Sequence, residues 1–320
     1  MTTSVPYLEF LSSDQAQTIF RISQRVMSSL REYLNNQGFV EFLPPVISTV
    51  TDPGLRGAER VSVSLYGQKA YVTSSMVFHK QVLATVFGKI YSFAPNVRLE
   101  PVSNDNSGRH LVEFCQLDLE EAGSSCEESM ALAEEMIAST VQDVVEHCQE
   151  PLGRLLRCLS IPTIPFARFT YDELLHKALS MGLSVRYGEE LPQEVETRVS
   201  EELGTFFWIT DYPKLCRGFY YREAADPRIV RSMDLIYPDG FGEAISGGER
   251  EYLPATIRRR IEEHQLSPLD FEPFLTYAES GLKPTSGFGI GFERLLRYIT
   301  GIRDISLIRP FPKIPGRVVM

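Results

Sequence analysis

Residues 97–120 read VRLEPVSNDNSGRHLVEFCQLDLE, and this stretch decides how the chain is organised. Two strand-like runs, 90–100 and 110–120, flank a loop built of Pro, Ser, Asn, Asp and Gly. Turn-forming residues between two such runs predict an antiparallel hairpin, here one with a long tip.

The polar side chains of this hairpin fall on shared faces, because side chains alternate along a strand. Arg98 and Glu100 share one face of the first strand, and Phe114, Gln116 and Asp118 share one face of the second. A cation, an aromatic ring, an amide and carboxylates on one face suit a small zwitterion bound beside a phosphorylated base. The residues alone leave open a salt-bridged sheet exposed to solvent.

Composition restricts the class of protein. The chain has 320 residues, a net charge of −10 and 43% hydrophobic residues, which admits two domains or one large α/β or α+β unit. No apolar run approaches the ~20 residues that span a bilayer. The first residues lack the basic region and apolar core of a signal peptide. We therefore expect a cytoplasmic protein with no membrane contact.

Cysteine usage and charge exclude further classes. The five cysteines are an odd number without a C-x-x-C pair, so they indicate reduced thiols and not a structural zinc site. The acidic balance counts against an extended phosphate-binding surface, which needs clustered Lys and Arg.

Three stretches carry a resemblance to a known family. The string R-x-E at 98–100, a loop ending in Arg109-His110, and E-F-x-x-x-D at 113–118 resemble the second signature motif of class II aminoacyl-tRNA synthetases, most closely in their aspartate/asparagine branch. GFGIGFERLLRYITG (287–301) resembles the third motif, and GFGEAISGGERE (240–251) resembles the E-x-x-x-G-G-x-R segment of that branch. The resemblance implies an α+β fold, an antiparallel sheet flanked by helices.

The N-terminal part resembles the first motif of the same family. A helix is predicted over 14–37, with Ser13 or Asp14 as its cap and Gly38 after its end, followed by the short strand FVEFLPPV. In the family this motif builds the dimer interface, so the resemblance implies a homodimer.

Further elements follow from periodicity and from turn residues. Helices are predicted at 74–88, 127–147, 251–264 and 268–280, and strands at 61–66, 69–73, 206–213, 218–223 and 231–237. Residues 150–204 match no motif and are expected to form a small helical insertion at the rim of the active site. In it, Thr170 and Glu173 form a capping box, and Pro192 is expected at the first position of another helix.

The resemblance implies one catalytic domain over 1–320. Only about a dozen residues precede the first helix, which leaves no room for the anticodon-binding domain of the family. We therefore expect no specific tRNA binding.

The resemblance also assigns a nucleotide site, with ATP and Mg²⁺ as its ligands. Arg98 would bridge the attacking carboxylate and the α-phosphate, and Arg294 would hold the γ-phosphate. The remaining ATP-binding residues are Arg109 at the tail, Phe114 on adenine with Glu100 at its edge, His110 and Glu243. Oxygen ligands suit Mg²⁺, a hard cation, and the candidates are Asp234, Glu243 and Ser246.

A substrate pocket is implied beside the nucleotide. Its residues are Ser75, Lys80, Gln116, Asp118 and Arg250, with Arg250 counted as catalytic alongside Arg98 and Arg294. Asp118 and Ser75 would hold an ammonium group, and Lys80 and Arg250 would pair with a second carboxylate. Two cations favour aspartate over neutral asparagine. Val77 stands where the aspartate enzymes have a glutamine.

Three functions compete. The chain resembles archaeal-type asparagine synthetases in strings such as S-M-x-x-H-K-Q and G-E-A-x-S-G-G-E-R-E, which implies aspartate activation at its β-carboxylate and capture by ammonia. The alternative is a truncated synthetase paralogue that transfers an aminoacyl group to tRNA, a carrier protein or another amine. The third is a catalytically inactive ligand sensor, against which the presence of all these charged residues argues.

Overall fold

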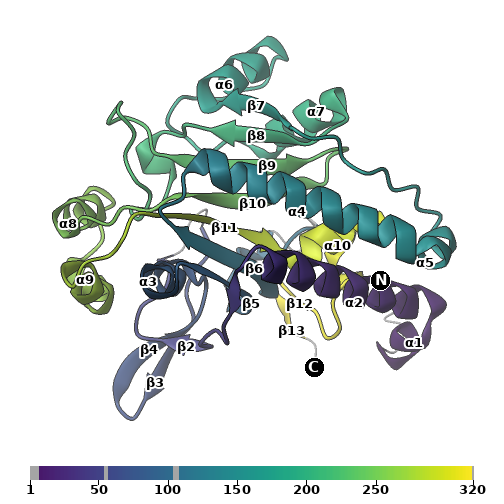
Figure 1. The fold of residues 1–320 in the computed structure, drawn as a ribbon, viewed down its shortest axis with the longest axis horizontal. Helices are drawn as coiled ribbons and strands as arrows, with labels where there is room; N and C mark the ends of the chain where they lie inside the picture. Colours follow the sequence, from purple (N-terminus) through teal and green to yellow (C-terminus); the bar gives the residue numbers. More distant parts are fainter. Residues whose placement is uncertain (1–6, 54–56, 104–107, 319–320) are drawn as a thin grey trace.

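The computed structural model describes residues 7–53, 57–103 and 108–318, and these fold around an eight-stranded sheet (Figure 1). Parts of the predicted hairpin tip and of the loop at 51–59 therefore lie outside the described residues. The spatial order of strands is β1 (Val40–Glu41), β5 (Lys89–Val97), β6 (Glu113–Ala122), β11 (Thr285–Gly291), β10 (Gly242–Glu249), β9 (Ser232–Tyr237), β8 (Phe207–Thr210) and β7 (Ala167–Thr170). The pairs β1–β5 and β7–β8 are parallel and the others antiparallel. The expected α+β class is confirmed.

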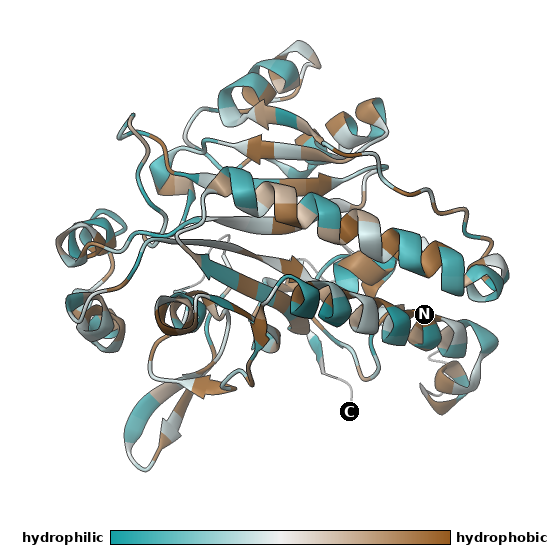
Figure 2. Ribbon diagram, viewed as in Figure 1, coloured by the Kyte–Doolittle hydropathy of each residue, from teal (hydrophilic) through white to brown (hydrophobic). Residues whose placement is uncertain are grey.

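One face of the sheet is covered by three helices, α2 (Asp14–Asn36), α4 (Cys126–His147) and α10 (Phe292–Thr300). The oxygen of Ser13 caps α2 by accepting from the backbone of Ala16, and Ser125 begins a capping box on α4. Brown and teal alternate along both helices, as amphipathic helices on a sheet require (Figure 2). Their apolar side meets Leu117 and Leu119 of β6.

The opposite face carries two separate helical groups. At one end α3 (Val77–Phe87), α8 (Pro254–Glu263) and α9 (Glu272–Glu279) pack around Phe78, Phe219, Phe271 and Phe274. At the other end α6 (Tyr171–Ser180) and α7 (Gln193–Leu203) cover β8 and β9. The middle strands lie between these two groups (Figure 1).

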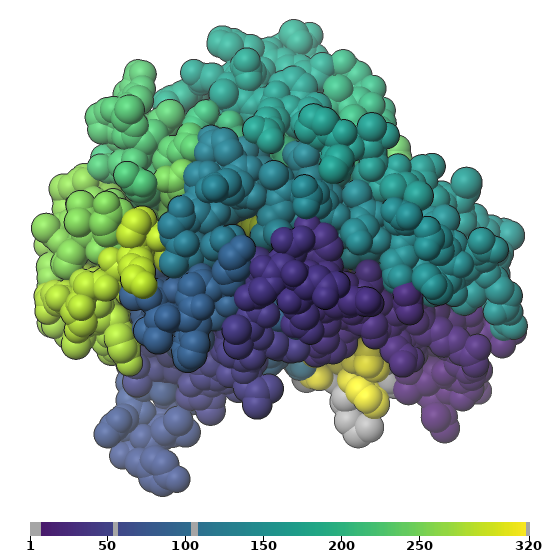
Figure 3. Space-filling view, viewed as in Figure 1, coloured from purple at the N-terminus to yellow at the C-terminus, as the bar shows by residue number. Residues whose placement is uncertain are grey.

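Smaller elements complete the chain. A three-stranded sheet, ordered β2 (Ile47–Ser48), β4 (Gln68–Val72) and β3 (Ser62–Leu65), projects from the body (Figure 3). The others are α1 (Tyr7–Ser12), α5 (Gln149–Arg154), β12 (Lys313–Ile314), β13 (Arg317–Val318) and the 3₁₀ turns η2 (Lys214–Cys216), η3 (Pro268–Phe271) and η4 (Ile305–Leu307). None of the helices in the described ranges has the length and apolarity to cross a membrane.

Two sequence predictions of local structure are wrong. Residues 218–223 form isolated bridges at Tyr221 and Glu223 and no strand, because Phe219 and Tyr220 turn into the aromatic core around Phe78. Pro192 is the N-cap of α7 and not its first residue. The predicted helix at 268–280 is divided into η3 and α9, whereas the Thr170 capping box is confirmed.

Glycines in β11 create the bare floor of the uncovered face. Alternation in TSGFGIG sends Phe288 and Ile290 into the core and leaves Gly287, Gly289 and Gly291 on the other side. A Cβ on Gly287 would lie 2.3 Å from Oε2 of Glu120 and 2.3 Å from the carbonyl oxygen of Leu119. Only glycine lets the polar side chains of β6 lie across this strand.

Replacing Gly287 by alanine should therefore destabilise the protein by about 1–3 kcal/mol, the usual cost of overpacking a filled site. Urea unfolding followed by fluorescence of the single, buried Trp208 measures this. Gly153→Ala is the matched control, since its added Cβ meets no atom within 4 Å. Equal unfolding free energies for the two variants would contradict this account of the strand.

Candidate active site

The uncovered middle strands form the floor of a cleft. All the predicted site residues line it except Asp234: Ser75, Lys80, Arg98, Glu100, Arg109, His110, Phe114, Gln116, Asp118, Glu243, Ser246, Arg250 and Arg294. They come from α3 and the residues before it, from β6, from the segment between β5 and β6, from β10 and the residue after it, and from the start of α10. Arg98 and Glu100, predicted on the first strand of the hairpin, lie just beyond the end of β5 at Val97. Segments more than 200 residues apart in sequence thus meet at one surface.

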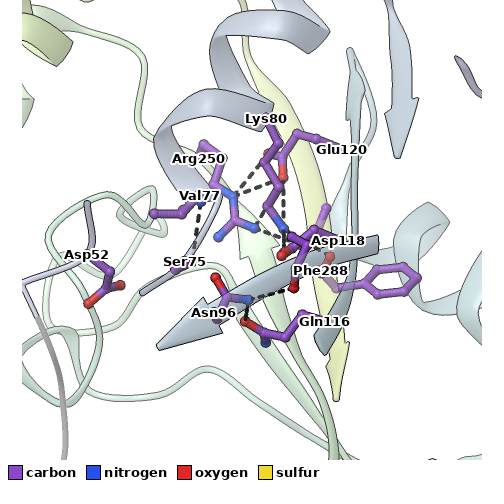
Figure 4. Close-up of polar contacts among 12 residues, drawn as sticks. Asp52, Ser75, Val77, Lys80, Asn96, Gln116, Asp118, Glu120, Arg250 and Phe288 are labelled. Atoms are coloured by element: carbon purple, nitrogen blue, oxygen red, sulfur yellow. Dashed lines mark hydrogen bonds and ion pairs between the residues drawn. The ribbon is translucent and has the colours of Figure 1, made fainter. Parts of the chain in front are cut away.

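Four buried charges form the centre of the floor (Figure 4). Nζ of Lys80 donates to Oδ1 of Asp118 and to the carbonyl of Phe288, both at 2.9 Å, and lies 3.7 Å from Oε2 of Glu120. Nε of Arg250 donates to Oε1 of Glu120 at 3.0 Å, and its Nη2 donates to Oε2 at 3.2 Å. We call Lys80, Asp118, Glu120 and Arg250 the charge array.

The charge array is almost wholly buried, since none of its four residues is more than 2% exposed. Charges at this depth persist only when they are paired and hydrogen-bonded. Burial alone would lower the pKa of Arg250, but the charge of Glu120 offsets it and the pKa lies above its usual value. Arg250 therefore remains ionised, and the array pairs two basic side chains with two carboxyl groups.

The cations of the array retain hydrogen-bonding capacity. An ammonium has three N–H donors and a guanidinium five. Lys80 uses two in hydrogen bonds, and Nη1 of Arg250 has no acceptor among the described residues. Both side chains line the cleft, so these donors are available to an anionic ligand.

Arg98 lines the cleft between the charge array and Phe114. Its Nε donates to the carbonyl of Ser74 at 3.0 Å, and its Nη2 reaches Oε1 of Gln116 at 3.5 Å. Asn96 holds that same amide oxygen at 3.0 Å, and the guanidinium carbon lies 5.1 Å from the ring centre of Phe114. These contacts fix the cation between the array and the half-buried ring of Phe114.

The far end of the cleft is cationic. Arg294 pairs with Glu243 at 3.3 Å, and Arg109 lies 3.8 Å from Glu196 of α7. The segment 150–204, expected to be helical, thus reaches the cleft through α7, but its strand β7 belongs to the main sheet. Gly242 has φ +84° and a Cβ there would meet Nη2 of Arg109 at 2.3 Å, so glycine is required for the guanidinium to pass. Burial, followed by the charges of Arg294 and Arg109, lowers the pKa of His110 to about 4.

The predicted metal ligands are only partly brought together. Glu243 and Ser246 face the cleft, whereas Asp234 lies opposite Ser246 on β9 and forms a short ion pair with Arg217. The described residues contain no cluster of three or more His, Cys, Asp or Glu that would hold a metal. The two cleft-facing oxygen ligands fit Mg²⁺, which commonly binds through one or two carboxylates and substrate phosphates.

Sequence analysis missed several cleft residues, among them Asp52, Arg217 and Tyr220. The hydroxyl of Tyr220 donates to Oδ2 of Asp52 in a short bond, and burial followed by the Asp52 charge raises the pKa of Tyr220. Thr51 is held by Ser74 at 2.9 Å. The start of the loop at 51–59 is thus anchored at the array end of the cleft. The sequence signal that could have identified Asp52 is its position in the Gly/Pro-rich loop at 51–59.

Comparison with known proteins identifies the family of this chain. Residues 2–315 match the family model for tRNA synthetases class II (D, K and N). The chain belongs to this family. Within it, the aspartate/asparagine branch is supported by 35% identity to an aspartate–tRNA(Asp/Asn) ligase of Methanopyrus kandleri, over 95% of this chain and 69% of that protein. An asparagine–tRNA ligase of Pyrococcus abyssi is 31% identical over 96% of this chain and 71% of its own length.

A solved structure of the same family has the same fold. Asparaginyl-tRNA synthetase from Pyrococcus horikoshii, complexed with asparaginyl-adenylate, superposes with a TM-score of 0.90 at 30% identity, over 97% of this synthetase and 71% of that chain. This chain is therefore an ATP-dependent ligase of the aminoacyl-tRNA synthetase family.

Two expectations about the group that accepts the aminoacyl moiety are corrected. The expectation of no specific tRNA binding is wrong, because the relatives that align over nearly the whole chain are ligases of tRNA. Net charge describes the whole chain, whereas nucleic-acid contact depends on local cationic groups. The specific resemblance to asparagine synthetases is not supported either, since these relatives are aspartate– and asparagine–tRNA ligases.

Lys80→Met should destabilise the synthetase by about 3–5 kcal/mol, because Asp118 would be left as a buried, uncompensated charge. Denaturant unfolding measures the loss. The double variant Lys80→Met/Asp118→Asn is the control, and it should recover more than half of the lost stability. A Lys80→Met protein as stable as the wild type would show that the array is not coupled in this way.

The lowered pKa of His110 predicts a pH dependence of stability. In the unfolded chain His110 binds a proton below its usual pKa near 6.5, whereas in the folded protein it binds one only below about pH 4. The folded state therefore loses stability as the pH falls from 6.5 to 4. Between pH 7 and pH 5 the wild type should lose roughly 2 kcal/mol more than His110→Gln. The other histidines are present in both proteins, so their contributions to the pH dependence cancel in the difference. Parallel pH profiles would contradict the assignment.

Proposed function

We propose that this synthetase activates aspartate with ATP, releasing pyrophosphate, and transfers the aspartyl group to tRNA. The observation that carries the proposal is the pair of unused donors on Lys80 and Arg250, which face the cleft from a buried position. A carboxylate oxygen satisfies both donors. The amide of asparagine would turn its own N–H groups toward at least one of two cations, which is unfavourable.

The ammonium of the amino acid is assigned to Asp118. Its Oδ1 accepts from Lys80, and a carboxylate accepts several hydrogen bonds at once. Ser75 and Gln116 line the same part of the cleft. Val77 supplies an apolar wall between Ser75 and Lys80 in place of a glutamine, so Asp118 carries most of this contact.

The α-carboxylate then points toward Arg98. With the side-chain carboxylate on Lys80 and Arg250, the α-carboxylate attacks the α-phosphorus of ATP, the bond to the β-phosphate breaks, and pyrophosphate leaves. Arg98 stabilises charge that develops on the α-phosphoryl oxygens, and Arg294 and Arg109 hold the tail. Phe114 stacks on adenine. This orientation reverses the β-carboxylate expected from the sequence.

Magnesium belongs to this proposal as a ligand of Glu243 and Ser246. A bound cation offsets the repulsion between the anionic nucleophile and the polyphosphate. Asp234 is instead paired with Arg217, a residue that lines the cleft.

The acceptor is the terminal ribose hydroxyl of tRNA, which attacks the aspartyl carbonyl and releases AMP. The relatives carry this part of the proposal, because aspartate– and asparagine–tRNA ligases align over nearly the whole chain. They favour tRNA over ammonia as the acceptor.

A homodimer is part of the proposal. The segment after α2 exposes an apolar group, Val40, Leu43, Val46 and Ile47, each at least 41% accessible. Contiguous exposed apolar side chains mark interaction sites, and this segment resembles the dimer-forming motif of the family.

Arg98→Ala should lower aspartate-dependent exchange of labelled pyrophosphate into ATP by about a hundredfold or more, because Arg98 acts on charge that appears in the transition state. Its unfolding free energy should be nearly unchanged. The control is Arg186→Ala, whose side chain is 81% exposed and outside the cleft. Wild-type exchange in Arg98→Ala would remove Arg98 from the mechanism.

The acceptor is tested with labelled aspartate and total tRNA. Label should become acid-precipitable and ribonuclease-sensitive, and ammonium chloride should not divert it into asparagine. Exchange activity accompanied by free asparagine and no charged tRNA would overturn the proposed acceptor while leaving aspartate activation in place.

A further inference from the structure

A second cleft adjoins the cationic end of the active site. Arg109 and His110 line both clefts, so the two are continuous. Gln193 and Thr197 of α7 form one wall of the second cleft, and Arg297 of α10 forms another. The assignments above leave this space without a function.

Arg297 is the residue that points to a ligand. It lies three positions after Arg294 in α10 and is 3% exposed. Its Nε donates to the carbonyl of Arg303 at 2.8 Å, but its buried Nη1 has no hydrogen-bond partner within the described ranges. A buried donor without an acceptor is unfavourable, so an acceptor brought by a ligand would stabilise it.

The surrounding charge is positive. Arg303 and Arg317 also line this cleft, and Arg303 is held by neutral groups, the carbonyl of Asp239 at 2.9 Å and the ring of Phe241 at 3.7 Å. Asp304 is the one carboxylate among the described residues that line this cleft, and its Oδ1 accepts from the backbone of Ser306 at 2.9 Å. Outside the lining, Glu196 lies 3.8 Å from Arg109.

Mutual repulsion among these cations is evident at Arg297. Burial, followed by the charges of Arg294, Arg109 and Arg303, lowers its pKa to about 10. No ion pair in the described part of the chain involves Arg297. An anion of high charge would relieve the repulsion.

We propose that this second cleft receives the pyrophosphate that leaves ATP during activation, an inference that rests on the proposed function. Arg294 and Arg109 hold the phosphate tail, and Arg297 lies ~4.5 Å further along the axis of α10, at the rise of 1.5 Å per residue. Guanidinium groups bind phosphate oxygens through paired N–H donors. The diphosphate therefore moves from one arginine group to the next, and the adenylate stays in the first cleft.

Calorimetric titration of sodium pyrophosphate into the whole protein tests the site. Arg297→Met, which keeps an apolar stem, should weaken binding by about tenfold or more, as expected for loss of charge-assisted hydrogen bonds. Arg317→Gln, an exposed change that does not endanger folding, should weaken it in the same direction. Arg198→Met, on α7 outside both clefts, is the matched control and should bind as the wild type does.

Equal pyrophosphate affinity in the wild type, Arg297→Met and Arg317→Gln would overturn the inference. A matching tenfold loss of ATP affinity in Arg297→Met would also overturn it, because the second cleft would then hold the tail of ATP itself. The supporting result is a raised KM for pyrophosphate in the exchange reaction with the KM for ATP unchanged.

The outcomes separate this inference from the proposed function. Absence of aspartate-dependent exchange in the wild type, with Arg297-dependent pyrophosphate binding retained, would refute the proposed function and leave a diphosphate site. Normal exchange with binding insensitive to Arg297 and Arg317 would refute the site and leave the function.

Discussion

The buried pairing of Lys80, Asp118, Glu120 and Arg250 is the constraint on which the rest of the site depends. Two cations and two carboxylates can lie beneath the cleft only because each satisfies another at hydrogen-bond distance. That arrangement requires a bare strand beneath it, which explains the glycine at every second position of β11. It also requires α3 to lie across β5 and β6, because Lys80 comes from that helix.

One face of the sheet forms the largest hydrophobic core, and the other forms the cleft. Apolar residues alternate onto the face beneath α2, α4 and α10, which forms the largest core. The other face leaves its central strands between two helical groups, so polar side chains of β6 and β10 line the cleft. The cleft then grades from a balanced charge array at one end to an excess of arginine at the other. This gradient suits a zwitterion beside a polyphosphate.

Much of this could be predicted from local patterns. The alternation in residues 114–118 placed Phe114, Gln116 and Asp118 on one face, and the glycine-rich stretch 287–301 was recognised by its resemblance to the third motif. Residues 218–223 were misjudged because strand-like composition does not reveal that Phe219 and Tyr220 complete an aromatic core. The ion pair between Asp234 and Arg217 was hidden because its partners meet only through packing. Arg297 was not singled out, because a helical pattern alone does not reveal that this arginine is buried.

The central claim is that Lys80 and Arg250 hold the side-chain carboxylate and leave the α-carboxylate to react. Hydroxylamine added to the wild-type enzyme with aspartate and ATP traps whichever acyl adenylate forms, and the hydroxamate is identified by mass spectrometry against both standards. The account predicts aspartate α-hydroxamate. Aspartate β-hydroxamate as the main product would contradict it and would mean that the array grips the amino-acid head instead.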